Sequence, residues 1–276
     1  MTIGAATRVA CVLGDPVSHS RSPVMHNAAS AALGLDRVYL ALRVDAGGLA
    51  TGIRGLQALG FEGANVTVPH KEAAWALCDT RSAEAELAGA ANTLSFADGR
   101  VHGHLTDGLG LVAALGSIPS RATIVGAGGS ARAAAAALLT AGTAELHVVA
   151  RNAERAARLT DDLRGRFPAA TIEHGERAPA RRGGALVHCT PIGGISALEE
   201  LPIAADAVRV MDVVADFAYR RDGSPTPLIA AALAAGIPVV DGLELLVRQG
   251  ALAFALWTGI DPPLDVMRRA VGSSCP

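Results

Sequence analysis

The first hundred residues alternate short apolar runs with segments in which apolar residues recur every three or four positions. The runs are typical of strands buried in a sheet, and the longer period is typical of amphipathic helices. This pattern predicts strands at 9–14, 38–44, 62–68 and 92–96, and helices at 23–33, 46–59, from Pro69 onward, and at 82–87. Because the strands alternate with helices, we expect a mainly parallel sheet.

A second unit with the same alternation begins near residue 107. Its predicted strands are 122–126, 145–150, 185–189, 208–214 and 237–240. Its predicted helices are 107–115, 130–141, 153–166 and 228–235, and two apolar helices follow at 243–257 and 263–271. These last two are too apolar to stand alone, so we expect them to return to the first unit. The chain is therefore expected to be an α/β protein with two domains, 1–105 plus 243–276 and 106–242.

Composition and charge exclude several classes of protein. The net charge is −2 and the basic residues are scattered, so no nucleic-acid partner is expected. The four cysteines share no short spacing typical of metal ligands, and no metal site is predicted. The N-terminus does not resemble a leader peptide, and no apolar stretch is long enough to span a membrane. These features favour a soluble cytoplasmic protein.

The clearest candidate for ligand binding is a turn between a predicted strand and a predicted helix, formed by Gly126, Ala127, Gly128, Gly129, Ser130 and Ala131. Gly126 allows a tight turn, Gly128 lets a pyrophosphate approach the backbone, and Ala131 permits close helix packing. The helix N-terminus then faces the phosphates. A merely tight turn is the alternative, but the strand-turn-helix context favours dinucleotide binding.

The end of the next predicted strand bears on which dinucleotide is bound. NAD sites place an acid there for the ribose hydroxyls, whereas NADP sites place an arginine near the 2′-phosphate. The strand ends next to Arg151, and Arg155 follows one helical turn later. The sequence therefore favours NADP, with two solvated surface arginines as the alternative.

Other candidate residues lie in the N-terminal domain. Ser20 and Ser22 precede a predicted helix, where they could cap it or bind a small carboxylate. Lys71 falls in a first helical turn, where the helix macrodipole disfavours a cation by about 0.3 to 1 kcal/mol at an exposed site. A solvated lysine is the simplest interpretation, but Asp107 offers another. Asp107 could cap the next helix or form a proton-transfer pair with Lys71.

Eight segments together resemble the shikimate dehydrogenase family and occur in the family's order across nearly the whole chain. They are GDPVSHSRSP (14–23), NVTVPHK (65–71), ANT (91–93), TDG (106–108), GAGGSAR (126–132), TPIG (190–193), TPL (226–228) and QGA (249–251). The resemblance implies an N-terminal α/β substrate domain, a Rossmann-type NADP-binding domain and a cleft between them. It also implies reversible reduction of 3-dehydroshikimate to shikimate by NADPH.

The resemblance assigns roles to individual residues. Ser20 and Ser22 would hold the substrate carboxylate, and Lys71 with Asp107 would exchange a proton as hydride moves between nicotinamide and substrate. The ring hydroxyls would be bound by Thr67, Asn92, Asp107 and Gln249. Besides the glycine-rich turn and the two arginines, the implied cofactor contacts are Thr190, Val213, Gly242 and Leu245. The implied partner is a small-molecule substrate, and the protein is expected to be a monomer or a homodimer.

Departures from the family's pattern leave the substrate open. The asparagine usual two residues before Thr190 is His188. The family has an aromatic residue three positions after an aspartate, and counted from Asp212 this position is Ala215. Either Tyr219 reaches the substrate instead or the pocket is wider.

Because of this change, quinate and an aminoshikimate remain alternative substrates. A ligand-sensing module without chemistry is a further alternative. The presence of both Lys71 and Asp107 and the intact glycines argue against it.

Overall fold

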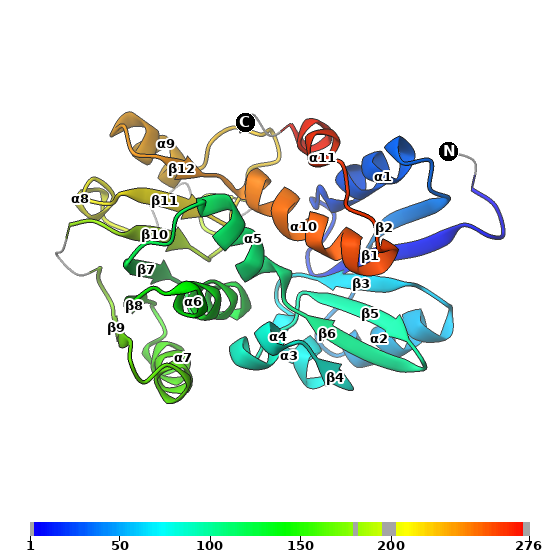
Figure 1. Ribbon diagram of the computed structural model, residues 1–276, viewed down its shortest axis with the longest axis horizontal. Coiled ribbons are helices and arrows are strands. Elements are labelled where there is room, and N and C mark those ends of the chain that lie inside the picture. Colours follow the sequence, from blue (N-terminus) through cyan, green and yellow to red (C-terminus); the bar gives the residue numbers. More distant parts are fainter. Residues whose placement is uncertain (1–2, 179–181, 195–202, 273–276) are drawn as a thin grey trace. The chain divides into compact units, whose positions relative to one another are not determined.

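The computed structural model describes residues 3–178, 182–194 and 203–272 (Figure 1). The chain divides into two compact units. The first comprises Met1–Gly110 and Leu246–Pro276, and the second comprises Leu111–Leu245. The chain passes between units within the helices α5 (Thr106–Leu115) and α10 (Gly242–Thr258). No helix in the described ranges is both long enough and apolar enough to span a membrane.

The first unit is built on a sheet with the strand order β2-β1-β3-β5-β6-β4 (Figure 1). These strands are β1 (Arg8–Gly14), β2 (Arg37–Arg43), β3 (Gly63–Val66), β4 (Thr80–Arg81), β5 (Thr93–Ala97) and β6 (Arg100–His104). The helices that lie wholly in this unit are α1 (Ser22–Ala32), α2 (Leu49–Ala58), α3 (Lys71–Ala76), α4 (Ala83–Ala88) and α11 (Leu264–Val271). Strands and helices alternate as predicted up to β5, which is followed directly by β6.

The direction of the strands changes at β5. Strand β1 pairs in parallel with β2 and β3, whereas β5 runs antiparallel to both β3 and β6. The hairpin between β5 and β6 turns at Asp98 and Gly99, which have φ values of 51° and 69°. Two successive residues of positive φ are typical of a tight hairpin turn. As a result, Asn92 and Thr106 flank the hairpin at the same end, where they can meet.

The core of the first unit follows from the alternation of side chains along β1. Cys11 and Leu13 pack in one cluster with Ile53 of α2. Val12 points to the opposite face and packs in a second cluster with Tyr39. A strand buried on both faces reads as a continuous apolar run, which is why the sequence pattern identifies it.

Histidine 26 belongs to an aromatic cluster beside this core. Its ring stacks on Tyr39, with 4.2 Å between ring centroids, and Phe254 and Trp257 of α10 lie within 6.1 Å of it. Burial lowers the pKa of His26 to about 3. The ring is therefore neutral at pH 7 and acts as part of the packing.

The second unit has a fully parallel sheet with the order β12-β11-β10-β7-β8-β9 (Figure 1). Its strands are β7 (Arg121–Val125), β8 (Glu145–Val149), β9 (Thr171–Gly175), β10 (Ala185–His188), β11 (Val213–Asp216) and β12 (Val239–Val240). Its helices are α6 (Gly129–Ala141), α7 (Ala153–Arg166), α8 (Ala205–Val208) and α9 (Pro227–Ala234). Numbered from β7, this is the 3-2-1-4-5-6 order of the Rossmann fold, which binds ligands at the carboxyl ends of its strands.

Helix α7 shows how the sequence sets these boundaries. The side chain of Asn152 caps the helix by accepting a hydrogen bond from the backbone N–H of Arg155 at 2.9 Å. Ala156, Leu159 and Leu163 are buried at the spacing of one helical face. The helix therefore begins and ends where the pattern predicts.

Several details differ from the prediction. Pro69 lies in a turn, and the helix begins at Lys71. The strand predicted at 208–214 is wrong, because 205–208 form α8 and β11 runs from Val213 to Asp216. The pattern also misses the strands β4 and β6 of the first unit and the edge strand β9, in which only Ile172 is buried. Edge strands carry polar residues on both faces and give a weak apolar signal.

Candidate active site

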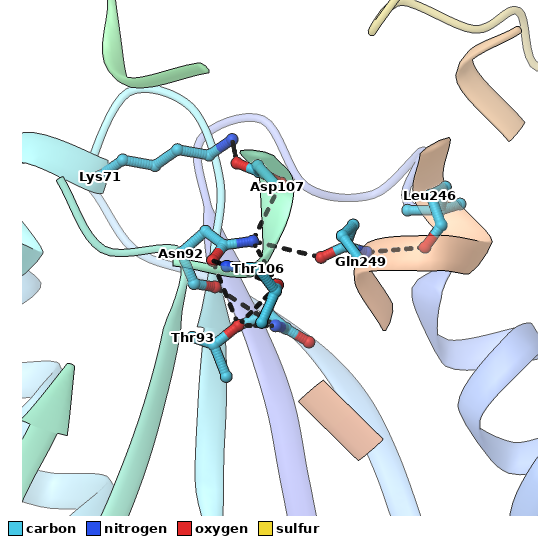
Figure 2. Close-up of polar contacts among 8 residues, drawn as sticks. Lys71, Asn92, Thr93, Thr106, Asp107, Leu246 and Gln249 are labelled. Atoms are coloured by element: carbon cyan, nitrogen blue, oxygen red, sulfur yellow. Dashed lines mark hydrogen bonds and ion pairs between the residues drawn. The ribbon is translucent and has the colours of Figure 1, made fainter. Parts of the chain in front are cut away.

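Asn92 is the centre of a polar network in the first unit, just before β5 (Figure 2). Its amide nitrogen donates to Thr106 Oγ1 and Asp107 Oδ1, both at 2.9 Å, and to Gln249 Oε1 at 3.3 Å. Its oxygen accepts from the backbone N–H of Thr106 at 2.7 Å. One side chain that is only 2% exposed thus joins the start of α5 to α10.

Asn65 supports this network from β3. Its nitrogen donates to Thr93 Oγ1 at 2.9 Å and to the backbone carbonyl of Asn92 at 3.2 Å. Its oxygen accepts from the hydroxyl of Tyr39 at 2.6 Å. Asn65, which interrupts the apolar run of this strand, therefore has the hydrogen-bond partners that a buried amide requires.

Lys71 and Asp107 form an ion pair next to Asn92. Lys71 Nζ lies 2.5 Å from Asp107 Oδ2, and the two side chains are 11% and 7% exposed (Figure 2). Asp107 is the second residue of α5, where the helix dipole favours a carboxylate. Lys71 is the first residue of the short helix α3, and the carboxylate offsets the unfavourable dipole there. Such a pair can exchange a proton with a bound substrate.

The sequence carries a further signal for Lys71. It is the only lysine among the 24 lysine and arginine residues of the chain. Arginine can replace lysine on a solvated surface, but its guanidinium stays protonated and is a poor proton-transfer group. The use of arginine at every other basic position therefore makes Lys71 a stronger candidate for proton transfer.

Gln249 reaches the network because α5 and α10 approach closely. A Cβ atom added at Gly110 would lie only 2.9 Å from the backbone nitrogen of Gln249 and 3.2 Å from its Cα. The side-chain nitrogen of Gln249 donates to the carbonyl of Leu246 at 2.8 Å, so its oxygen faces Asn92. Glycine at 110 thus sets the position of Gln249.

We expect Gly110→Ala to destabilise the protein by about 1 to 3 kcal/mol, because the added methyl group would press on backbone atoms. Gly165→Ala is the matched control, since it also lies in a helix but has no atom within 4 Å of the added Cβ. There alanine should stabilise by about 0.5 to 1 kcal/mol through helix propensity. Urea unfolding of both variants measures the difference. Equal stabilisation of both would show that α5 and α10 are not in close contact at Gly110.

The other N-terminal candidates occupy loops at the ends of β1 and β3. Ser20 Oγ accepts from the backbone N–H of Ser22 at 3.3 Å, so Ser20 contributes to the start of α1. Ser22 is 5% exposed and is the first residue of that helix. Thr67 packs so closely on Gly14 that an added Cβ there would be 2.4 Å from its methyl group. The N-cap of α1 is Arg21, and no side chain caps the helix, so neither serine has the capping role. Carboxylate binding by the serines stays a prediction.

In the second unit, the glycine-rich turn connects β7 to α6. Gly126 has φ 119°, and an added Cβ would lie 3.1 Å from Thr190 Cγ2, so the turn requires glycine. Gly128 has no atom within 4 Å of an added Cβ, which leaves room for a ligand against the backbone. Gly128 is also the N-cap of α6 and provides no side-chain cap. These features fit a dinucleotide pyrophosphate.

Both predicted 2′-phosphate residues lie beyond the carboxyl end of β8. Arg151 and Arg155 are exposed. The side chain of Asn152 between them is used to cap α7. In the loop after β8 and the first turn of α7, the one carboxylate is Glu154, which is also exposed. A pair of accessible guanidinium groups suits a phosphate.

Thr190 belongs to a buried cluster at the ends of β10 and β11. His188 contacts Asp216 at 2.8 Å and Thr190 Oγ1 at 2.5 Å. Thr226 Oγ1 donates to Asp216 Oδ2 at 2.6 Å. His188 and Asp216 are both fully buried. Sequence reasoning notes His188 only as a departure and does not identify Asp216.

The aspartate at the ligand-binding edge of the sheet is Asp216, not Asp212. Asp212 precedes β11 at the opposite edge and accepts from the backbone N–H of Gly184 at 2.7 Å. Ala215 is 0% exposed and pairs within the sheet, so it does not line a pocket. The apparent loss of the family's aromatic residue at Ala215 arises from counting from Asp212. Counted from Asp216, the aromatic residue is present three positions later as Tyr219.

The remaining cofactor candidates separate into two groups. Val213 is the first residue of β11 and lies about 10 Å from the carboxyl end of the sheet, three residues of strand away. The structure thus does not bring it together with the glycine-rich turn. Gly242 packs against the loop after β11, where an added Cβ would be 2.2 Å from the carbonyl oxygen of Ala218. Leu245, one turn further along α10, is 3% exposed.

Family models match three stretches of the chain. Residues 12–94 match the shikimate dehydrogenase substrate binding domain. Residues 114–177 match the shikimate / quinate 5-dehydrogenase model, and residues 242–271 match the shikimate 5′-dehydrogenase C-terminal domain. Both units therefore contain matched segments.

Individual relatives match over almost the full length. The NADP(+) shikimate dehydrogenase of Methanopyrus kandleri is 40% identical, covering 98% of this chain and 97% of the relative. The shikimate 5-dehydrogenase of Thermus thermophilus, solved with NADP(H) and shikimate, has a TM-score of 0.81 and 36% identity over 97% of this chain and 100% of that one. The 5-ketofructose reductase of a Gluconobacter strain has a TM-score of 0.84 and 30% identity over 98% and 99%. With such identity across the whole length, the chain belongs to the shikimate dehydrogenase family.

Proposed function

We propose that the protein is an NADP-dependent shikimate dehydrogenase that reversibly reduces 3-dehydroshikimate to shikimate. The observation that carries the proposal is the Lys71–Asp107 pair, 2.5 Å apart and held by Asn92, in a member of this family. In this proposal, residues 1–105 with 243–276 form the substrate domain. Residues 106–242 form the dinucleotide-binding domain.

Lys71 and Asp107 carry out the proton transfer. Bound NADPH supplies the hydride to the carbonyl carbon. As negative charge develops on the carbonyl oxygen, the ammonium of Lys71 stabilises it and donates a proton. Asp107 holds the ammonium in place and helps Lys71 to regain a proton after the transfer. In the reverse direction, the same pair removes the proton from the substrate hydroxyl.

The substrate is held by hydroxyl and amide groups of the first unit. Ser20 and Ser22 bind its carboxylate near the start of α1, where backbone N–H groups favour an anion. The ring hydroxyls are bound by Thr67, Asn92, Asp107 and Gln249. Asn92 already donates to Asp107 and Gln249, so these groups are fixed before substrate binds. Preorganisation of this kind lowers the entropic cost of binding.

Tyr219 completes the substrate site in this proposal. Matching the family's aspartate to Asp216 gives Tyr219 the place of the family's aromatic residue. The same shift of four positions moves the cofactor contact expected at Val213 to Phe217. The backbone N–H of Phe217 donates to the carbonyl of His188 at 2.9 Å, which supports a place at the ligand-binding edge.

NADP is bound by the second unit. The N–H groups of the turn at 126–131 and the start of α6 hold the pyrophosphate, and Arg151 and Arg155 hold the 2′-phosphate. The nicotinamide half is bound near Thr190, Gly242 and Leu245. We place the protein in the cytoplasm, without nucleic-acid partners, as a monomer or a homodimer.

Initial rates with a set of substrates and both nicotinamide cofactors test this function. Shikimate with NADP should give the highest kcat/KM. Quinate, an aminoshikimate and 5-ketofructose are the comparison substrates, the last because the Gluconobacter reductase has the same fold. A higher kcat/KM with any of them would reassign the substrate. Tight binding of shikimate without absorbance change at 340 nm would instead favour a sensing module.

A further inference from the structure

The buried cluster around His188 has a defined direction of hydrogen bonding. His188 and Asp216 are the last residues of β10 and β11 and lie opposite each other in the register. Asp216 Oδ1 accepts from the backbone N–H of Ala218 at 2.9 Å, and its Oδ2 accepts from Thr226 Oγ1 at 2.6 Å. An ionised carboxylate can only accept. Nδ1 of His188, 2.8 Å from Oδ1, must therefore carry a proton and donate it to Asp216.

The direction of the next hydrogen bond depends on the charge of the ring, which we take as neutral in the proposal that follows. In the neutral ring, Nε2 has no proton and acts as an acceptor. Thr190 Oγ1 lies 2.5 Å from Nε2, so the threonine hydroxyl donates its proton to His188. Its oxygen also accepts, at a long 3.4 Å, from the backbone N–H of Ile192. Within the described ranges, the hydroxyl oxygen of Thr190 therefore has one lone pair left to accept a further hydrogen bond.

A lone pair attracts N–H and O–H donors and repels phosphate oxygens, which are acceptors at neutral pH. Thr190 stands beside the glycine-rich turn, 3.1 Å from an added Cβ at Gly126. Strands β7 and β10 are neighbours, and dinucleotides cross the sheet at this reversal of strand order. Because the arginines follow β8, the half of the dinucleotide over β10 is the nicotinamide nucleoside.

We propose that His188 is a positioning residue for the cofactor. With its proton placed by Asp216, His188 holds the hydroxyl of Thr190 as an acceptor for a neutral donor of the nicotinamide nucleoside, either the carboxamide NH₂ or a ribose hydroxyl. This inference rests on the proposed NADP site. It adds a residue that touches no ligand and acts through Thr190.

Binding of two ligands to His188→Asn tests the proposal. Asparagine places its amide near the position of Nδ1, so it keeps the bond to Asp216 and gives up the fixed bond to Thr190. The Kd of NADPH should rise about three- to tenfold, the value of one hydrogen bond. The Kd of 2′-phospho-ADP, which lacks both the nicotinamide and its ribose, should change less than about twofold, because the substitution removes none of its hydrogen bonds. Titration calorimetry measures both without turnover.

Two further measurements separate positioning from a structural role. In a Thr190→Val background, His188→Asn should have no further effect on NADPH binding, because the two residues act in series. Nitrogen NMR of protein with labelled histidine should show His188 protonated at Nδ1 alone. The proposal would be overturned if the Kd values of both ligands rose equally, or if His188→Asn still weakened NADPH binding in the Thr190→Val background. A ring protonated at Nε2 would also overturn it. Failure of the unaltered protein to bind 2′-phospho-ADP would instead refute the NADP site itself.

Discussion

Replacing Lys71 by alanine is expected to lower kcat for shikimate oxidation by a factor of about 10² to 10⁴, the usual contribution of a positioned proton-transfer group. The substitution removes the amine and leaves Asp107 without the ion pair that spans 2.5 Å. The Kd of NADPH should stay the same, because the proposed cofactor contacts lie in the second unit. Stopped-flow or steady-state absorbance at 340 nm measures the rate. Unchanged turnover would remove Lys71 from the mechanism.

Lys71→Arg distinguishes proton transfer from charge stabilisation. Arginine keeps a cation within reach of Asp107, but its guanidinium does not give up a proton at ordinary pH. If proton exchange is the role, the arginine variant should stay within about tenfold of the alanine variant, since general acid–base catalysis accounts for the loss. Recovery of most of the activity by arginine would show that Lys71 acts only through its charge.

Arg151→Asp is expected to change cofactor preference more than any other single substitution. Charge-assisted hydrogen bonds to a phosphate contribute enough to give a loss of about 10- to 150-fold in kcat/KM for NADP. NAD lacks the 2′-phosphate, so its kcat/KM should change little or improve. Initial rates with both cofactors at saturating shikimate give the ratio.

Arg166→Asp is the matched control for charge. Arg166 is exposed at the other end of α7, about 20 Å from the start of the helix. The same change of charge there should leave the NADP to NAD ratio unaltered. Equal losses for both cofactors in Arg151→Asp would mean that Arg151 serves the structure of the β8–α7 connection.

The sequence predicts most of the fold because local signals agree with the tertiary arrangement. In α7, the Asn152 cap and the apolar face both identify the helix. The prediction is wrong where apolar residues do not follow a strand period. Val208 and Met211 are buried three residues apart, which is the spacing of a helical turn and not of a strand.

Asp216 shows why the site is harder to predict than the fold. Asp212 and Asp216 flank the same four-residue strand, and a motif count alone does not say which carboxylate lies at the carboxyl end. Their partners decide it. Asp216 is bonded to His188 and Thr226, whereas Asp212 is bonded to Gly184 at the other edge.

The Asn92 network depends on contacts between residues far apart in sequence. Asn92 and Gln249 are separated by 157 positions and meet because Gly110 lets α5 approach α10. No local pattern carries this information. The resemblance identifies each residue as a candidate, but their mutual bonds and directions come only from the folded chain.

The ion pair of Lys71 has a practical consequence. Because this residue is the chain's only lysine and its side chain is 11% exposed, amine-reactive dyes, cross-linkers and resins have one side-chain target besides the terminal amine. Coupling through lysine would therefore block the proposed catalytic group. Conversely, the extent of acylation at this one position gives a direct readout of occupancy, since a bound substrate would shield the amine from the reagent.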